Sequence, residues 1–211
     1  MKTSFWEKET LYNPDHTKPI RLVKNVVAEM KKRGMSDVLE IGCGKGRNCL
    51  YLAGEGLNVT GVDSDYKTLL SFQELLREEG LSAAIACADM SALPFVRECF
   101  DLIMFIHVLT FVKEYARQQT LEEAKRVLRE GGIMVLVERS QRDPLYQEGV
   151  QVEKDTYRCR GMTHHFFPKE ELESLLSPLK IAVLRESRII DTVHGNPHVH
   201  GIWFCIVLNE P

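Results

Sequence analysis

Three glycines at alternate positions are the residues of this chain best spaced to do chemistry. The segment VLEIGCGKGRN, residues 38–48, places Gly42, Gly44 and Gly46 directly after an apolar run. Glycine has no Cβ, so its backbone adopts left-handed angles and approaches a bound molecule closely. A helix that follows offers its unpaired N–H groups and positive dipole end to an electron-rich ligand. The spacing predicts a strand that ends in a ligand-binding turn, and a plain packing turn is the alternative.

A carboxylate follows at the distance where nucleotide-binding folds hold a ribose. Asp63 ends the next apolar run, about 20 residues after the glycines. Its two oxygens suit a pair of hydroxyl groups, although a helix N-cap or turn role is the alternative. The glycine spacing is G-x-G-x-G, because Arg47 occupies the third position of the dinucleotide fingerprint. This departure disfavours a hydride-transferring dehydrogenase.

Strand-like and helix-like runs alternate from Val38 onward and would bring these residues together. Such alternation predicts an α/β fold, a doubly wound parallel sheet with helices on both faces. The predicted strands are 38–41, 58–62, 83–88, 100–106 and 133–137, and the predicted helices are 47–55, a run from Tyr66 that Gly80 ends, and 113–129. The glycines and Asp63, at successive strand ends, should lie at the ligand-binding edge of the sheet.

The alternation changes after the fifth predicted strand. Residues 138–167 are polar, with scattered aromatic side chains and no clear period, and connections of this length are usually functional or mobile. Pro168 fits the first turn of a helix at 169–176. Strands at 181–189 and 202–208 have no helix between them, so they should pair as a hairpin and make the last strand antiparallel.

Length and composition limit the class of protein. With 211 residues and 44% hydrophobic content, the chain fits a single domain over residues 1–211. The 27 basic side chains nearly balance 30 acidic ones, which makes nucleic acid an unexpected partner. The N-terminus is too polar for a signal peptide and no apolar run approaches about 18 residues, so no membrane span is expected. The six cysteines form no C-x-x-C pair, which favours reduced thiols and a cytoplasmic location.

Four segments together resemble the class I S-adenosylmethionine-dependent methyltransferases. The glycine segment with Asp63 resembles the first motif of that family. ADMSALPF, FDLIMFIHVLTFV and AKRVLREGGIMVLVE resemble the segments after its third strand, after its fourth strand and around its fifth strand. GRNCLYLA is similar to tellurite-resistance-type small-molecule methyltransferases. The resemblance covers residues 20–209 and implies a seven-stranded sheet in the order 3-2-1-4-5-7-6 with an antiparallel last strand.

The resemblance implies S-adenosylmethionine as cofactor. Glu40 would lie near its amino group, Asp63 would accept the ribose hydroxyls and Ser64 would lie beside the adenine. Asp89 would accept from the adenine amine, and His107 would lie under the sulfonium. The implied cofactor-binding residues are Glu40, Gly42, Cys43, Gly44, Gly46, Asp63, Ser64, Asp89, Met90, Ile106 and His107.

Three residues are candidate catalytic groups: His107, His165 and Tyr157. His107 is either a base or a buried structural histidine. For the pair His164-His165, alternation would point one ring inward and the other to solvent. Tyr157 lies among basic residues that would hold an anion or simply be solvated. Methyl transfer needs alignment and exclusion of water, and a general base only for some acceptors.

Two further segments are functional candidates. Residues 1–36 are predicted to form a lid and helix segment, and the lid would carry the aromatic residues Phe5, Trp6 and Tyr12. His194, His198 and His200 raise a metal hypothesis, but no acid or cysteine completes a set, so no metal is predicted and a core or substrate-wall role is favoured.

The resemblance favours a methyltransferase that acts on a small molecule, with residues 138–167 as a substrate-capping connection. One alternative is methylation of RNA, such as tRNA, or of protein. The short stretch before the first helix and the lack of an Asn/Asp-Pro-Pro-Tyr/Phe segment after the fourth strand lower that expectation. A second alternative is a regulatory module that binds the cofactor without catalysis. The sequence makes no prediction of the acceptor's identity or of oligomeric state.

Overall fold

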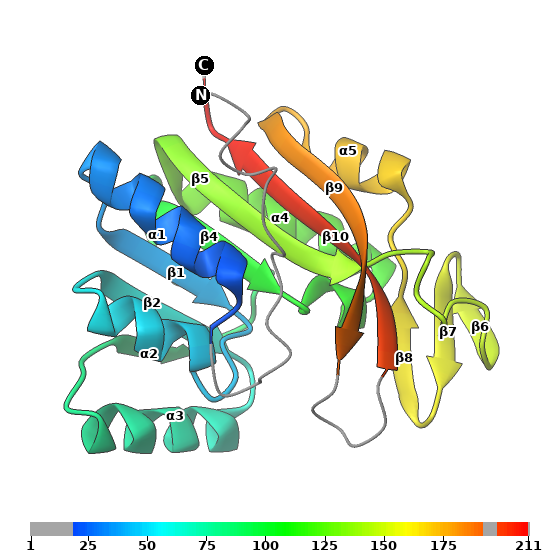
Figure 1. Cartoon of the computed structure of the whole chain (residues 1–211), viewed down its shortest axis with the longest axis horizontal. Helices are drawn as coiled ribbons and strands as arrows, with labels where there is room; N and C mark the ends of the chain where they lie inside the picture. The colour runs from blue at the N-terminus through cyan, green and yellow to red at the C-terminus, as the bar shows by residue number, and fades with distance from the viewer. Residues whose placement is uncertain (1–18, 192–197, 211) are drawn as a thin grey trace.

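The computed structural model describes residues 19–191 and 198–210, with only the backbone described at residues 191 and 198. Its centre is a seven-stranded sheet in the order β3-β2-β1-β4-β5-β10-β9 (Figure 1). The strands are β1 (Asp37–Ile41), β2 (Asn58–Asp63), β3 (Ala84–Cys87), β4 (Phe100–Ile106), β5 (Leu128–Arg139), β9 (Lys180–Asp191) and β10 (His198–Leu208). β10 runs antiparallel to both of its neighbours. The predicted order and the antiparallel last strand are confirmed.

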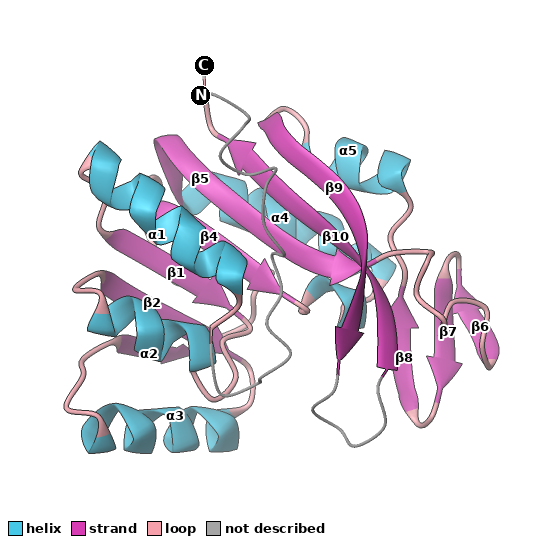
Figure 2. Cartoon of the chain, viewed as in Figure 1, coloured by secondary structure: helices cyan, strands magenta, loops and turns pink. Residues whose placement is uncertain are grey.

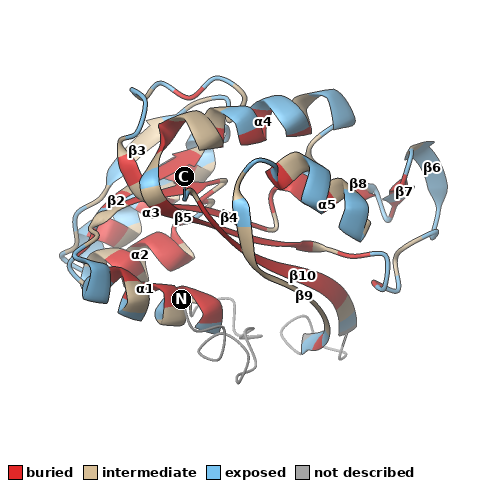
Figure 3. Ribbon diagram, turned by 90° about the horizontal axis from the view of Figure 1, so that it is seen from above, coloured by how far each residue is buried: buried red, intermediate tan, exposed pale blue. Residues whose placement is uncertain are grey.

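Helices cover both faces of this sheet, as Figures 2 and 3 show. One face is covered by α1 (Arg21–Arg33), α2 (Arg47–Gly54) and α3 (Tyr66–Glu78), and the other by α4 (Glu114–Val127) and α5 (Lys169–Leu176). Successive strand residues point to opposite faces, so Met104 of β4 packs in the first layer and Phe105 in the second. The apolar run of β4 therefore supplies both halves of the core.

Several boundaries differ from the prediction; β10, for example, begins at His198 and not at residue 202, and β5 differs most. β5 begins at Leu128 and not at Ile133, because β4 pairs with it on both sides of an irregularity in register, Phe100 with Leu128 and Leu102 with Ile133. Within residues 19–191 and 198–210, the helices all fall short of the length and apolar content that a bilayer crossing requires.

The segment 138–167 contains regular structure that the sequence did not predict. It folds into a three-stranded antiparallel sheet of β6 (Val150–Glu153), β7 (Thr156–Cys159) and β8 (Met162–His165). Arg160 and Gly161 join β7 to β8 with φ angles of 51° and 82°, and two successive positive φ angles define a tight hairpin turn. Strands of four residues are too short to show a period. For this reason residues 138–167 were predicted to be a long connection without regular structure.

Candidate functional site

The glycine turn lies between the end of β1 and the start of α2. Gly42, Gly44 and Gly46 have left-handed φ angles of 69°, 54° and 80°. A Cβ atom on Gly42 would collide with Val108, and one on Gly46 would collide with the Phe72 ring. A Cβ atom on Gly44 would meet no heavy atom within 4 Å. Packing therefore requires two of the glycines, and the third leaves open space beside the turn.

Asp63 supports this turn from the end of β2. Its Oδ2 accepts a hydrogen bond from the N–H of Gly44 at 2.9 Å, and its Oδ1 accepts from the N–H of Asp65 at 2.9 Å. A carboxylate oxygen has lone pairs for more than one donor, so each oxygen can also accept from a ligand hydroxyl. The side chain both fixes the glycine turn and remains suited to a ligand with two adjacent hydroxyls.

A cavity of about 330 Å³ opens beside Asp63. Its wall consists of Gly42, Val62, Asp63, Ser64, Ala88, Met90, His107, Val108, Phe111 and Val112. These residues lie at or just after the carboxyl ends of β1, β2, β3 and β4. The strand order reverses there, because β1 lies between β2 and β4 (Figure 1). Open α/β sheets bind ligands at this point, and the volume is within the range of small-molecule sites.

The wall that follows β4 begins with a strained residue. His107 has a φ of 57° and donates its N–H to the carbonyl of Val137 at 2.7 Å. A left-handed angle at a residue other than glycine costs about 1–3 kcal/mol and is concentrated at functional sites. The chain then enters a short 3₁₀ helix, η2 (Leu109–Phe111), whose exposed Phe111 ring lines the cavity.

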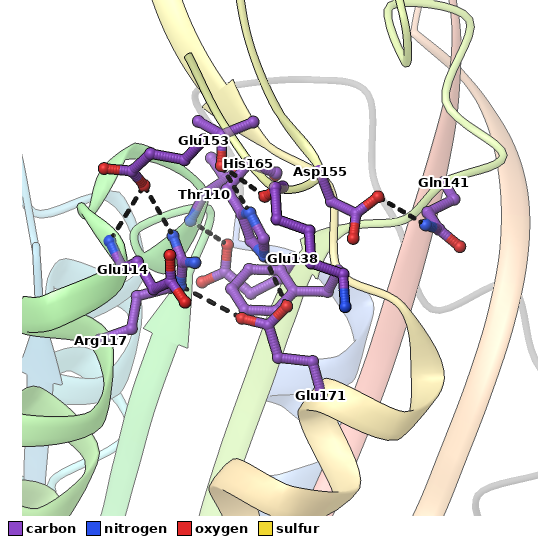
Figure 4. Close-up of polar contacts among 12 residues, drawn as sticks. Thr110, Glu114, Arg117, Glu138, Gln141, Glu153, Asp155, His165 and Glu171 are labelled. Atoms are coloured by element: carbon purple, nitrogen blue, oxygen red, sulfur yellow. Dashed lines mark hydrogen bonds and ion pairs between the residues drawn. The ribbon is translucent and has the colours of Figure 1, made fainter. Parts of the chain in front are cut away.

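Glu138 fixes the backbone of this wall from β5. Its buried carboxylate accepts hydrogen bonds from the N–H groups of Val108, Leu109 and Thr110 at 3.1, 2.9 and 3.0 Å. Burial raises the pKa of Glu138 to about 7, while the three N–H donors act against that rise. The Thr110 hydroxyl donates to the carbonyl of His165 at 2.6 Å, which ties the wall to β8 (Figure 4).

Comparisons with known proteins show which family this chain is similar to. A model described as a methyltransferase domain matches residues 39–136. An S-adenosylmethionine-dependent methyltransferase structure from Methanosarcina mazei matches with a TM-score of 0.74 at 26% identity, over 83% of this chain and 93% of that chain. Residues 39–136 therefore carry a methyltransferase domain, and the fold is that of the class I S-adenosylmethionine-dependent methyltransferases.

Two further relatives agree with this assignment. TehB from Haemophilus influenzae shares the fold, with a TM-score of 0.68 at 22% identity over 88% of this chain and 61% of TehB. The uncharacterized methyltransferase YodH of Bacillus subtilis is 31% identical over 108 residues, which is 51% of this chain and 45% of YodH. The chain spans about half the length of the curated relatives it matches.

The residues at the cavity fit the cofactor of this methyltransferase family. A Cβ on Gly44 would meet no heavy atom within 4 Å, and the carboxylate of Asp63 lines the cavity, where it can accept from ligand hydroxyls such as those of a ribose. Of the predicted cofactor-binding residues, the structure gathers Gly42, Asp63, Ser64, Met90 and His107 around the cavity. Three further lining residues were not among the predicted cofactor-binding residues: Val108, Phe111 and Val112. They belong to the FDLIMFIHVLTFV segment that resembles the family.

Glu40 is the predicted cofactor residue whose surroundings differ most from expectation. It is buried, and its two oxygens accept from the Asn48 side-chain amide at 2.6 Å and the Cys49 thiol at 2.9 Å. Burial raises the pKa of this carboxyl. Glu40 therefore joins β1 to α2, and its predicted contact with the cofactor's amino group stays a prediction.

The remaining predicted cofactor residues lie around the cavity without lining it. Asp89 is exposed, and its Oδ1 accepts from the N–H and hydroxyl of Ser91 at 2.8 and 2.7 Å, bonds that lower the pKa of Asp89. Cys43 and Ile106 are buried in the core. The contacts predicted for the rest stay predictions; the residues concerned are Cys43, Gly44, Gly46, Asp89 and Ile106.

His165, predicted as catalytic, has both ring nitrogens engaged inside the protein. Nδ1 lies 2.9 Å from the Thr156 hydroxyl, and Nε2 lies 3.1 Å from Oε2 of Glu171. Oε1 of Glu171 is 3.2 Å from Nε of the buried Arg117 (Figure 4). These contacts fasten β8 to α4 and α5, beside a larger hollow of about 740 Å³ that the glycine turn does not reach. The catalytic role stays a prediction, and the geometry gives His165 a structural one.

Tyr157, the other candidate from this segment, is also away from the cavity wall. Its ring is buried and lies 5.5 Å from the Tyr146 ring and 6.3 Å from the Phe166 ring, measured between centroids. The predicted catalytic role of Tyr157 stays a prediction. In the described structure the residue belongs to an aromatic cluster inside the small sheet.

His164 departs from the sequence expectation. Alternation predicted that one ring of the His164-His165 pair would face solvent, but both are buried. The two faces of β8 are both covered, one by the aromatic cluster and η2, the other by α4 and α5. Nδ1 of His164 has no hydrogen-bond partner among the residues that the structure describes.

The histidines near the C-terminus show no metal site in the described part. Nδ1 of His200 lies 3.2 Å from Oδ2 of Asp143 and 3.1 Å from Nη1 of Arg139. Within residues 19–191 and 198–210, no group of three or more His, Cys, Asp and Glu side chains is placed to hold one metal ion. His194, the His198 side chain and the predicted lid residues Phe5, Trp6 and Tyr12 lie outside the described residues.

Proposed function

We propose that this protein transfers a methyl group from S-adenosylmethionine to a small-molecule acceptor. The observation that carries the proposal is the cavity itself, in which the glycine turn and Asp63 stand opposite the His107–Val112 wall. When bound, the cofactor supplies a methyl group already activated by its sulfonium. The protein has to align the acceptor and exclude water.

One wall of the cavity would bind the cofactor, and the other would exclude water from the reacting groups. Asp63 and Ser64 would orient the ribose and adenine end of the cofactor, and Gly44 would leave room beside them. The opposite wall, held by Glu138, would place apolar Val108 and Phe111 where they exclude water from the reacting groups. His107 would lie at the junction of the two walls, at the strand end nearest the transferred methyl group.

A small-molecule acceptor fits the charge of the chain better than a nucleic acid. Basic and acidic residues number 27 and 30, so no overall positive field attracts a phosphate backbone. The relatives act on different acceptors by name, from ajmaline to phosphatidylethanolamine and tRNA cytidine. Methylation of tRNA is therefore the second candidate. The cytoplasm is the proposed location, supported by six cysteines that are all free thiols.

A screen for release of S-adenosylhomocysteine tests the proposal. The wild-type protein would be incubated with S-adenosylmethionine and either fractionated metabolite pools or bulk tRNA, with the Asp63→Ala variant as the matched control. The proposal expects release with a metabolite fraction and none with tRNA. Release with tRNA alone would establish the second candidate, and release with neither, by a protein that binds the cofactor, would favour a non-catalytic module.

A further inference from the structure

The hollow of about 740 Å³ beside His165 has no role in the proposed methyl transfer. It is lined by residues of α4, of α5 and of the turn that joins β6 to β7. It shares no lining residue with the cavity beside Asp63. Its volume is within the range of small-molecule sites, so the hollow is a second candidate binding site.

The wall of this hollow is acidic. Its charged lining residues are four carboxylates and two cations: Glu114, Asp155, Glu170, Glu171, Arg117 and Lys154. Arg117 and Glu171 neutralise each other as an ion pair, with 3.2 Å between Nε and Oε1 (Figure 4). Three carboxylates then remain against the single ammonium of Lys154. A ligand that enters the hollow therefore meets a negative potential.

Asp155 gives this acidic wall a buried hydrogen-bonding group. Only 8% of the residue is exposed, and its Oδ1 accepts from the Gln141 amide at 2.9 Å and the Tyr146 hydroxyl at 2.8 Å. Its Oδ2 has no hydrogen-bond partner among the residues that the structure describes. In Figure 4 this second oxygen points away from Gln141, toward the side of the view where Glu171 and α5 lie. The lone pairs of Oδ2 are available to a donor in the hollow.

The charge of Asp155 also reaches the facing carboxylate of Glu171. Burial raises the pKa of Glu171 and its contacts with His165 and Arg117 lower it by more, while the charge of Asp155 acts in the same direction as burial. The two carboxylates are therefore close enough to repel each other. A cation bound between them would relieve that repulsion.

We propose that this hollow binds a small organic cation with primary ammonium groups, a linear diamine, through the carboxylate of Asp155. An ammonium group offers three N–H donors, and its hydrogen bonds to a carboxylate are charge-assisted and short. One ammonium group donates to Oδ2 of Asp155, and the exposed Glu114 and Glu170 supply negative charge for the other. This site goes beyond the proposed methyltransferase function and does not depend on it.

Three other ligand classes fit the hollow less well. A metal ion needs several converging ligands, and the described part of the chain has no group of three or more His, Cys, Asp and Glu side chains placed to hold one. A quaternary ammonium favours an aromatic cage, whereas the described lining residues include no aromatic side chain. An anion would be repelled by the three carboxylates that remain unneutralised.

Calorimetric titration of the whole chain with 1,5-diaminopentane tests the proposal, and we expect one saturable site. Asp155→Asn keeps an oxygen for Gln141 and Tyr146 and tolerates the left-handed φ of 53° at this position. It should weaken diamine binding by about 10- to 100-fold, the loss expected for a hydrogen bond to a charged group. Lys154→Gln removes the competing cation and should tighten binding by about 2- to 5-fold.

Matched controls separate this site from a general attraction of cations to an acidic protein. Glu130→Gln removes an exposed carboxylate that does not line the hollow, and it should leave the affinity for the diamine unchanged. Glutarate, a dianion of the same five-carbon length, and 1,5-pentanediol, a neutral diol, should not bind. All of the variants should bind S-adenosylhomocysteine as tightly as wild type does.

Equal diamine affinity in wild type and Asp155→Asn would overturn the proposal, and so would binding of glutarate or equal weakening by Glu130→Gln. A wild type that binds S-adenosylhomocysteine but no diamine would overturn this inference and leave the proposed function intact. A wild type that binds the diamine but no S-adenosylhomocysteine would have the opposite meaning.

Discussion

Asp63 combines two tasks in one side chain. Its oxygens already hold the N–H groups of Gly44 and Asp65, and the same carboxylate lines the cavity. A change at this residue should therefore act on the shape of the glycine turn and on the cofactor together. Glu138 has a comparable place on the opposite wall, where one carboxylate orders three successive N–H groups.

Asp63→Ala should weaken binding of S-adenosylhomocysteine by about 1.5–3 kcal/mol, the size expected for lost hydrogen bonds to a charged group. Titration calorimetry measures this directly. The matched control is Asp65→Ala, which removes the N-cap of α3 and its bonds to Lys67 and Thr68. That control should cost about 1 kcal/mol of stability and leave affinity unchanged. An Asp63→Ala protein that folds and binds as tightly as wild type would show that the ribose lies elsewhere.

Glu138 should give the protein a pH-dependent stability. Its pKa rises on folding from 4.5 to about 7, so the folded state holds a proton that the unfolded state has released. The resulting stabilisation is complete below the unfolded pKa and is lost as the pH rises through about 7, a change of about 3 kcal/mol. Urea unfolding of wild type and Glu138→Gln, at several pH values, isolates this effect as a difference. A difference that does not vary with pH would mean that the pKa of Glu138 does not change on folding.

The small sheet β6-β7-β8 is inserted in the chain between β5 and α5. Its interior is aromatic, with Tyr146, Tyr157 and Phe166 in mutual contact. Its outer attachment is polar, through His165 and Glu171 to Arg117. The sheet therefore holds η2, and through η2 the acceptor side of the cavity, in a fixed position.

Tyr157→Ala should lower turnover while leaving cofactor affinity nearly intact. Loss of a buried aromatic ring costs about 3–5 kcal/mol of stability, and the aromatic cluster beneath His164 would loosen. Tyr157→Phe keeps the ring and serves as the control, with near wild-type turnover. The comparison needs steady-state kinetics and calorimetry on the same preparations. Wild-type turnover from a folded Tyr157→Ala protein would show that the small sheet has no part in acceptor selection.

The sequence predicted the elements with strong periods and missed those without one. The range of β4 was predicted residue for residue, because an apolar run between two polar stretches marks a buried parallel strand. β7 and β8 were missed, since four residues give no period and the Arg160-Gly161 turn was not recognised. Asp63 was predictable from its spacing to the glycines. That Nδ1 of His164 has no partner within residues 19–191 and 198–210 was not predictable, because burial on both faces of β8 depends on contacts far apart in sequence.

One edge of the seven-stranded sheet gathers the residues that line the cavity. The glycine turn after β1, Asp63 at the end of β2 and the wall after β4 meet there because parallel strands share one carboxyl edge. The helices on both faces and the antiparallel β10–β9 pair complete the class I methyltransferase fold around that edge. The central claim is that this edge binds S-adenosylmethionine and not a dinucleotide.

Calorimetric titration of the wild-type protein with S-adenosylhomocysteine, and separately with NAD, tests that claim most directly. We predict one binding site per chain with a dissociation constant in the micromolar range for S-adenosylhomocysteine. No binding heat is expected with NAD, because Arg47 replaces the third glycine of the dinucleotide fingerprint. Binding of NAD, with no heat from S-adenosylhomocysteine at millimolar concentration, would contradict it.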